Sequence, residues 1–135
     1  MTVLLIMVIV SATITIIGYL LLKNMRIGHE AQVFESTKQA SESMAVAIMD
    51  EIDLDNLTVS CNGTVTDWCP VPANVACKIK LPSDIVAALN ASDLNGTALL
   101  LANCTQPNGQ HAYTIQVTTV APDNTTTTIY FIYQK

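Results

Sequence analysis

The first 22 residues contain no charged side chain and form an almost unbroken apolar run. About 20 apolar residues are enough for one helix to cross the hydrocarbon core of a membrane. The run is longer and more uniformly apolar than a surface helix of a small soluble domain. A secretory signal peptide would begin with basic residues, have a shorter apolar core and end at a small-residue cleavage site. Because the sequence lacks these features, we expect the run to remain part of the working protein.

The charges after the run and the cysteines disagree about where the rest of the chain lies. Lys23 and Arg26 follow the run directly, and the positive-inside rule would keep the C-terminal part in the cytoplasm. An even number of cysteines in a small domain rich in Thr and Asn instead predicts two disulfides and an oxidising, extracytoplasmic setting. Those cysteines are Cys61, Cys69, Cys77 and Cys104. The conflict disappears if the chain is a mature form whose short basic leader is removed before Met1.

Helical character continues from residue 23 to about residue 53, where there is no proline. Seven residues recur at steps of four and three, with Lys38 at the one gap, and predict a stripe along one helix face. They are Ile27, Ala31, Phe34, Ser41, Ala45, Ile48 and Ile52. A helix of about 53 residues would be about 80 Å long, more than a small domain needs for its own core. The acidic residues at 50–55 predict a solvated turn, with a calcium site as the alternative.

From residue 57 onward the apolar pattern changes to short alternating runs separated by turn residues. We expect strands at 57–61, 75–81, 97–104, 111–120 and 125–133, and a short helix at 85–89 capped by Ser83 or Asp84. The last three strands, joined by short turns, predict an antiparallel meander whose one face packs on the helix stripe. The fold class is therefore α+β, with a long N-terminal helix on a small antiparallel sheet. The parts are 1–22, an amphipathic continuation 23–53, and a globular disulfide-bonded domain 54–135.

The sequence contains no motif for catalysis, for metal binding or for a cofactor, so we expect a protein that is not an enzyme. His29 and His111 lie in no nucleophile or metal pattern. Zinc is the alternative role for the cysteines, but C-x-x-C and Cys/His spacings are absent. The net charge of −5 offers no basic patch, and we expect no nucleic-acid partner.

Six asparagines each begin an Asn-x-Ser/Thr triplet, which is the acceptor signal for N-linked glycans in hosts that have the transferase. They are Asn56, Asn62, Asn90, Asn95, Asn103 and Asn124. For the disulfides we favour Cys61–Cys69 and Cys77–Cys104, because these pairs tie neighbours along the chain. All three pairings remain open from the sequence alone.

This layout of an apolar helix half, an amphipathic half and a small disulfide-bonded sheet resembles a type IV pilin over the whole chain. The resemblance implies a leader cut by a prepilin peptidase, an N-methylated Met1, and a membrane-anchored subunit that the pilus assembly machinery builds into an extracellular filament. It also implies a homopolymer whose N-terminal helices bundle in the filament core, and Gly18 would lie where such helices unwind. The residues expected to pack there are Leu4, Leu5, Met7, Val8, Ile9, Ile14, Ile16, Ile17 and Gly18.

Two other functions are carried as alternatives. Pilins usually have glutamate at the fifth mature position, whereas Leu5 stands here, as in some minor pilins and pilin-like proteins. The chain would then act at a filament tip or in a secretion machine. The second alternative is a membrane-anchored binding module that recognises a ligand through the loop between Cys61 and Cys77. Trp68 in that loop is either a partner-binding anchor or a plug for a small core.

Overall fold

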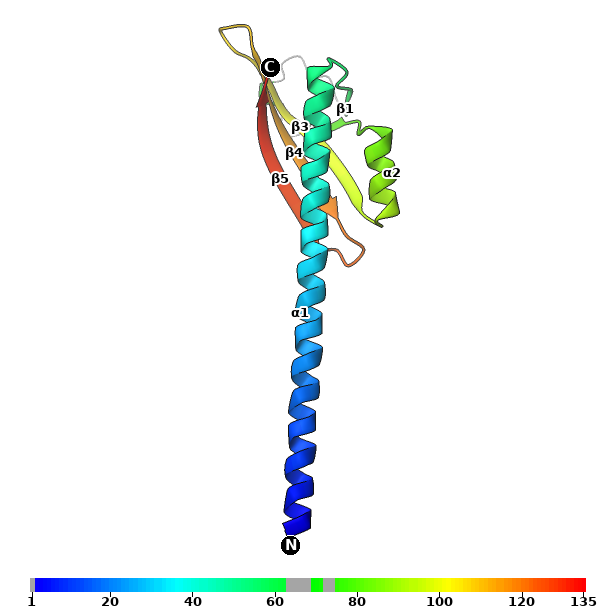
Figure 1. Cartoon of the computed structure of the whole chain (residues 1–135). Helices are drawn as coiled ribbons and strands as arrows, with labels where there is room; N and C mark the ends of the chain where they lie inside the picture. The colour runs from blue at the N-terminus through cyan, green and yellow to red at the C-terminus, as the bar shows by residue number, and fades with distance from the viewer. Residues whose placement is uncertain (1, 63–68, 72–74) are drawn as a thin grey trace. The chain divides into compact units, whose positions relative to one another are not determined.

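The computed structural model describes residues 2–62, 69–71 and 75–135, with side chains described from Ile14 onward. It is an α+β protein with one long N-terminal helix and a five-stranded antiparallel sheet (Figure 1). In chain order the elements are α1 (Thr2–Asp53), β1 (Val59–Cys61), β2 (Cys77–Ile79), α2 (Ser83–Ala91), β3 (Asn95–Thr105), β4 (His111–Val120) and β5 (Thr126–Gln134). The chain divides into two compact units, Met1–Val33 and Phe34–Lys135. Helix α1 contributes to both.

In the second unit the strands are neighbours in sequence order, β1-β2-β3-β4-β5, and every pair is antiparallel. The predicted meander is therefore confirmed, and it extends to all five strands. The β3–β4 and β4–β5 pairs run over nearly their whole lengths, whereas β1 and β2 are three residues each. The sheet thus has one long edge strand, β5, and one short edge strand, β1.

The turns of the two long hairpins share one design, at residues 106–110 and 121–125. In each, proline is the second residue, and the amide of the fourth residue donates to the carbonyl of the first at 2.9 Å. The fourth residue is left-handed, Gly109 with φ of 84° and Asn124 with φ of 66°. Proline presets the first bend, and Gly and Asn are the residues that tolerate a positive φ best. Local turn chemistry therefore favours both hairpins, and the β3–β4 register shifts once more between Leu100 and Ala102.

The core lies between the inner face of the sheet and the part of α1 that belongs to the second unit. On α1 the buried side chains are Thr37, Ser41, Met44, Ala45, Ile48 and Ile52. The C-terminal half of the predicted stripe, from Ser41 onward, is therefore confirmed. The N-terminal half is wrong, because Ile27 and Phe34 are more than half exposed. The buried line runs through Thr37 instead, because the sheet supplies a hydroxyl partner there.

Two hydroxyl pairs join α1 to the sheet inside this core. Ser41 Oγ and Thr119 Oγ1 are 2.7 Å apart, and so are Thr37 Oγ1 and Thr127 Oγ1. Thr37 Oγ1 also donates to the carbonyl of Phe34 at 2.9 Å. Buried hydroxyls without partners are costly, so these pairs allow polar side chains in an otherwise apolar interface.

Gly96, at the second position of β3, is required by close packing. A Cβ there would lie 2.5 Å from Met44 Sδ and 2.6 Å from Leu89 Cδ1. Both contacts are closer than real Cβ atoms show, so an alanine would force these two side chains to move. Helices α1 and α2 therefore meet β3 at a point where no side chain fits.

Both helices end in the same motif, with an aspartate where glycine is commonest. Asp55 has φ of 56° and Asp93 has φ of 54°, and the next residue's amide donates to a carbonyl five positions earlier at 2.9 Å. In α2 the residues so joined, Leu89 and Leu94, are both buried, as is typical of a Schellman motif. The predicted cap at the start of α2 is wrong. Pro82 is the N-cap, and it has no side-chain hydrogen bond to offer.

The disulfides link Cys61 to Cys77 and Cys69 to Cys104, so the favoured pairing of sequence neighbours is wrong. Cys61 and Cys77 face each other directly in the β1–β2 ladder, with Cα atoms 4.0 Å apart. The segment after Cys69 returns to β3, where the amide of Val71 donates to the carbonyl of Leu101 at 2.9 Å. Sheet pairing, rather than closeness along the chain, therefore selects the partners.

Candidate assembly segment

The first unit presents a set of large apolar side chains to solvent, which we call the assembly segment, residues 14–27. Nine of them are each more than half exposed: Ile14, Ile16, Ile17, Tyr19, Leu20, Leu21, Leu22, Met25 and Ile27. Successive residues of a helix turn by about 100°, so four in a row at 19–22 cover every side of it. The exposed apolar surface therefore surrounds the helix and does not form one stripe.

A helix that is apolar on all sides is normally buried on all sides. Full burial of one Leu, Ile or Met side chain contributes roughly 1.5–3 kcal/mol. Together, the exposed surface of nine such side chains forms an apolar patch larger than the few hundred square ångströms that monomeric soluble proteins usually expose. The segment can therefore lower its free energy by association with another apolar surface. Among the residues that the structure describes, no helix is long and apolar enough to cross a membrane.

The predicted filament-core residues fall into two groups. Met1, the expected methylation site, and the side chains of Leu4, Leu5, Met7, Val8 and Ile9 lie outside the described residues. Ile14, Ile16 and Ile17 are exposed, and their packing in a filament core stays a prediction. Gly18 has no atom within 4 Å of the place where a Cβ would be, so packing within the described chain does not require a glycine there.

Charged side chains appear on α1 toward the C-terminal end of the assembly segment. Arg26 Nε lies 3.2 Å from Glu30 Oε1, one helix turn away, and both side chains are largely exposed. Such a pair stabilises a helix by only a few tenths of a kcal/mol. His29 is exposed as well. These residues suit an aqueous surface, so apolar side chains no longer surround the helix after Ile27, although Phe34 and Val46 are still more than half exposed.

The acidic turn at the end of α1 is held by two residues of the C-terminal strand region. Lys135 Nζ donates to the carbonyls of Ile52 and Asp53 at 2.9 Å each and to Asp55 Oδ1 at 2.7 Å. Tyr133 donates its hydroxyl to Asp53 Oδ1 at 2.7 Å. Within the described residues, no group of three His, Cys, Asp or Glu side chains could hold a metal ion. The carboxylates instead accept hydrogen bonds that fix β5 to the helix end.

The same contacts shift the titration of the tyrosine. The hydrogen bond to Asp53 raises the pKa of Tyr133 above its ordinary value of about 10, and desolvation and the negative charges of Asp53 and Asp50 act in the same direction. A phenolate would have to sit against a carboxylate. The neutral form of Tyr133 is therefore favoured by the fold.

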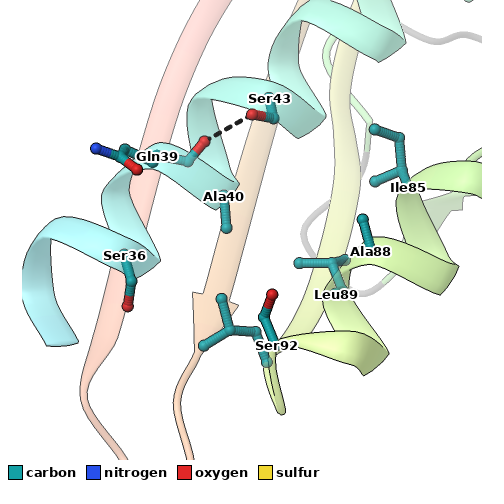
Figure 2. A pocket seen from close by; sticks show the side chains of 9 residues that line it. Ser36, Gln39, Ala40, Ser43, Ile85, Ala88, Leu89 and Ser92 are labelled. Atoms are coloured by element: carbon teal, nitrogen blue, oxygen red, sulfur yellow. Dashed lines mark hydrogen bonds between the residues drawn. The ribbon is translucent and has the colours of Figure 1, made fainter.

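A groove of about 280 Å³ lies between α1 and α2 (Figure 2). Its walls are Ser36, Gln39, Ala40 and Ser43 on one side and Ile85, Ala88, Leu89, Ser92 and Leu94 on the other. Figure 2 shows Ser43 bonded to the carbonyl of Gln39, a contact of 2.9 Å. None of these side chains is an acid, a base or a strong nucleophile at neutral pH. The groove offers shape and hydroxyl groups but no catalytic set.

The remaining predicted residues take local roles. His111 Nδ1 lies 3.3 Å from Asn103 Oδ1 and 3.5 Å from Thr105 Oγ1, on neighbouring strands. Asn62 accepts a hydrogen bond from the amide of Ala76 at 2.6 Å. Trp68, the proposed anchor or plug of the loop, lies outside the described residues.

Sequence reasoning missed the cap by Lys135, the tyrosine contact and the hydroxyl pairs. Of these, only the cap by Lys135 has a basis in the sequence, because a basic residue near a helix C-terminus is favourable. The cap could not be assigned from the sequence, because Lys135 and Asp55 are 80 residues apart.

Searches of protein families, of curated proteins and of solved structures find no match to this chain.

Proposed function

We propose that this protein is the structural subunit of an extracellular, type IV pilus-like filament. The subunits associate through the N-terminal helix, whose apolar first half forms the filament core, while the disulfide-bonded domain forms the filament surface. Before assembly the uncharged residues 1–22, which include side chains outside the described ones, anchor the subunit in the cytoplasmic membrane. The chain has no catalytic role in this proposal, and its partners are further copies of itself, a prepilin peptidase and the assembly machinery.

One observation carries the proposal: residues 14–27 expose large apolar side chains on every side of α1, while the second unit contains the protein's core. All buried side chains among the described residues lie between Thr37 and Thr127. The second unit therefore has a core made of its own residues. Two disulfides within the domain fit an extracytoplasmic setting. Because the domain has its own core, the apolar surface of the helix can pack on the helices of other subunits, as a helical polymer needs.

The test is substitution of arginine at the centre of the assembly segment. Ile17→Arg places a charge on a residue that is 57% exposed in the single chain and would be buried in the filament. The matched control is Ile132→Arg, the same change at a residue of β5 that is 68% exposed. Each gene would replace the original in the producing cells. Sheared surface material would then be examined by negative-stain electron microscopy and mass spectrometry.

We expect thin filaments composed of this chain from the parent and from Ile132→Arg, and none from Ile17→Arg. Burying a charge in an apolar bundle costs several kcal/mol for each subunit. Every subunit of the polymer carries the same substitution, so this cost recurs at every position. Normal filaments from Ile17→Arg would refute the proposal. Filaments in which this chain is only a trace component would assign it to the minor subunits, as Leu5 suggests. Membrane-bound protein without filaments would favour the anchored binding module.

A further inference from the structure

The globular domain is unusually rich in acceptor triplets for N-linked glycans. Residues 54–135 contain eight asparagines, and six of these are followed two positions later by Ser or Thr. Ser and Thr make up 15 of the 82 residues in this segment, so chance alone would give about one or two such triplets. The excess indicates that the triplets themselves are useful to the protein.

The structure separates these triplets by accessibility. Asn56, Asn90, Asn95 and Asn124 are exposed, and so is the Ser or Thr that completes each triplet. Within the described residues, none of these four side-chain amides takes part in a hydrogen bond. Each amide nitrogen is therefore accessible to an enzyme from solvent.

Two of the four lie in turns, where a transferase can most readily approach the backbone. Asn56 follows the end of α1, and Asn124 is the left-handed residue of the β4–β5 turn. In both, the hydroxyl of the completing threonine, Thr58 or Thr126, donates to the carbonyl of the asparagine at 3.3 Å. The hydroxyl that the acceptor signal requires is therefore held next to the acceptor residue.

Asn103 differs from these four. It is half-buried, and its Oδ1 lies 3.3 Å from His111 Nδ1. The middle residue of its triplet, Cys104, is bonded to Cys69. A glycan here would have to break the contact with His111 and fit beside a disulfide. The remaining triplet, at Asn62, extends into residues outside the described ones.

Three of the exposed triplets lie at the same end of the sheet. Asn95 is the first residue of β3 and pairs with Val120, the last residue of β4, from which the chain enters the turn that contains Asn124. Asn90 lies in the last turn of α2, five residues before Asn95. Glycans at these positions would cover one end of the domain together.

We propose that Asn56, Asn90, Asn95 and Asn124 carry N-linked glycans and that Asn103 does not. The asparagine Nδ2 forms a bond to C1 of a sugar supplied by a lipid-linked oligosaccharide phosphate. The bond from C1 to the phosphate oxygen breaks, the lipid phosphate leaves with the electron pair, and one amide proton is released. No oxidant or reductant is needed. The inference shares with the filament proposal the export of the domain, but it does not require polymerisation.

The test is glycopeptide mapping and intact-mass measurement of the full chain from the producing cells. We expect glycan-bearing peptides at the four exposed asparagines and an unmodified peptide containing Asn103. An intact mass equal to that of the bare disulfide-bonded polypeptide, or a glycan on Asn103, would overturn the proposal. An exposed asparagine found fully unmodified would remove that site from it. Filaments seen by microscopy from a chain without glycans would separate this failure from failure of the filament proposal.

Two matched variants at Thr126 test the acceptor signal of Asn124 without changing the asparagine itself. Thr126→Ala should lower the intact mass by one glycan, whereas Thr126→Ser keeps the hydroxyl and should leave the mass of the glycan in place. Asn103→Gln should change the mass only by that of one methylene group. Retention of the Cys61–Cys77 and Cys69–Cys104 links in non-reduced peptide maps would show that each variant folds. Equal glycan content in Thr126→Ala and the parent would refute the assignment at Asn124.

Discussion

The two buried hydroxyl pairs between α1 and the sheet differ in how many hydrogen bonds the helix hydroxyl makes. Ser41 and Thr119 are both fully buried, and their oxygens are 2.7 Å apart. Thr37 and Thr127 are also 2.7 Å apart, but Thr37 keeps a second hydrogen bond to the carbonyl of Phe34. Removing the sheet hydroxyl therefore leaves Ser41 without its partner, whereas Thr37 still donates one hydrogen bond.

The perturbation is threonine to valine, which replaces a hydroxyl by a methyl group of nearly the same size and creates no cavity. Thr119→Val should reduce the free energy of unfolding by about 1–3 kcal/mol, the cost of leaving a buried hydroxyl unpaired. Thr127→Val should cost only about 0.5–1.5 kcal/mol, the net value of one hydrogen bond. The double variant Ser41→Ala with Thr119→Val should recover much of the loss, because both polar groups are then absent.

The assay is equilibrium urea unfolding of a fragment comprising residues 34–135, followed by far-ultraviolet circular dichroism. That fragment corresponds to the second compact unit and contains both disulfides. The midpoint should fall with little change in the slope, because the surface exposed on unfolding is the same. Equal losses in Thr119→Val and Thr127→Val would refute the reasoning, since Ser41 would then have found another partner, such as a carbonyl of its own helix. A double variant as unstable as the sum of its singles would refute it as well.

Three further predictions concern the ends of the helices and can be checked in the same fragment. Asp93→Gly should stabilise it by about 1 kcal/mol, because Asp93 has a positive φ that glycine adopts without strain, whereas Asp93→Ala should not stabilise it. Lys135→Met should destabilise it by about 1 kcal/mol at low salt, and less at high salt, by removing the cation that caps α1. Above pH 10 the parent should lose stability, because the folded state holds the Tyr133 proton more tightly than the unfolded state. Tyr133→Phe should lose less over the same pH range, and parallel curves would contradict the raised pKa of Tyr133.

The elements that the sequence predicted well are those specified by neighbouring residues. The strand at His111–Val120 has the predicted bounds, and both long hairpin turns form where proline is followed by Asn or Asp. Alternation and turn chemistry act within a few residues, so they can be read without knowing the fold. The same holds for the end of α1 at Asp53, within the acidic stretch where the helical pattern stops.

The features that the sequence did not predict depend on residues far apart in the chain. The partner of Cys61 is Cys77 because β1 and β2 pair, and Cys69 reaches Cys104 because its segment returns to β3. Thr37 is not part of the predicted apolar stripe, but it is buried and its hydroxyl meets that of Thr127, 90 residues later. A hydrophobic pattern cannot reveal such a pair, since it records only the polarity of each residue and not the partner that satisfies it.

The two parts of α1 expose apolar surface to very different extents, and this difference bears on the proposed function. From Thr37 onward the helix turns a face of small, hydroxyl-bearing and aliphatic residues to the sheet, where all of them are buried. Between residues 14 and 27 the apolar side chains are larger and more numerous, yet nine of them are each more than half exposed. Exposed apolar surface of this extent favours aggregation unless something covers it. The buried side chains among the described residues all belong to the second unit, so its core consists of its own residues. In the filament that we propose, the helices of neighbouring copies would supply that cover, and the interactions that hold the domain together would stay unchanged.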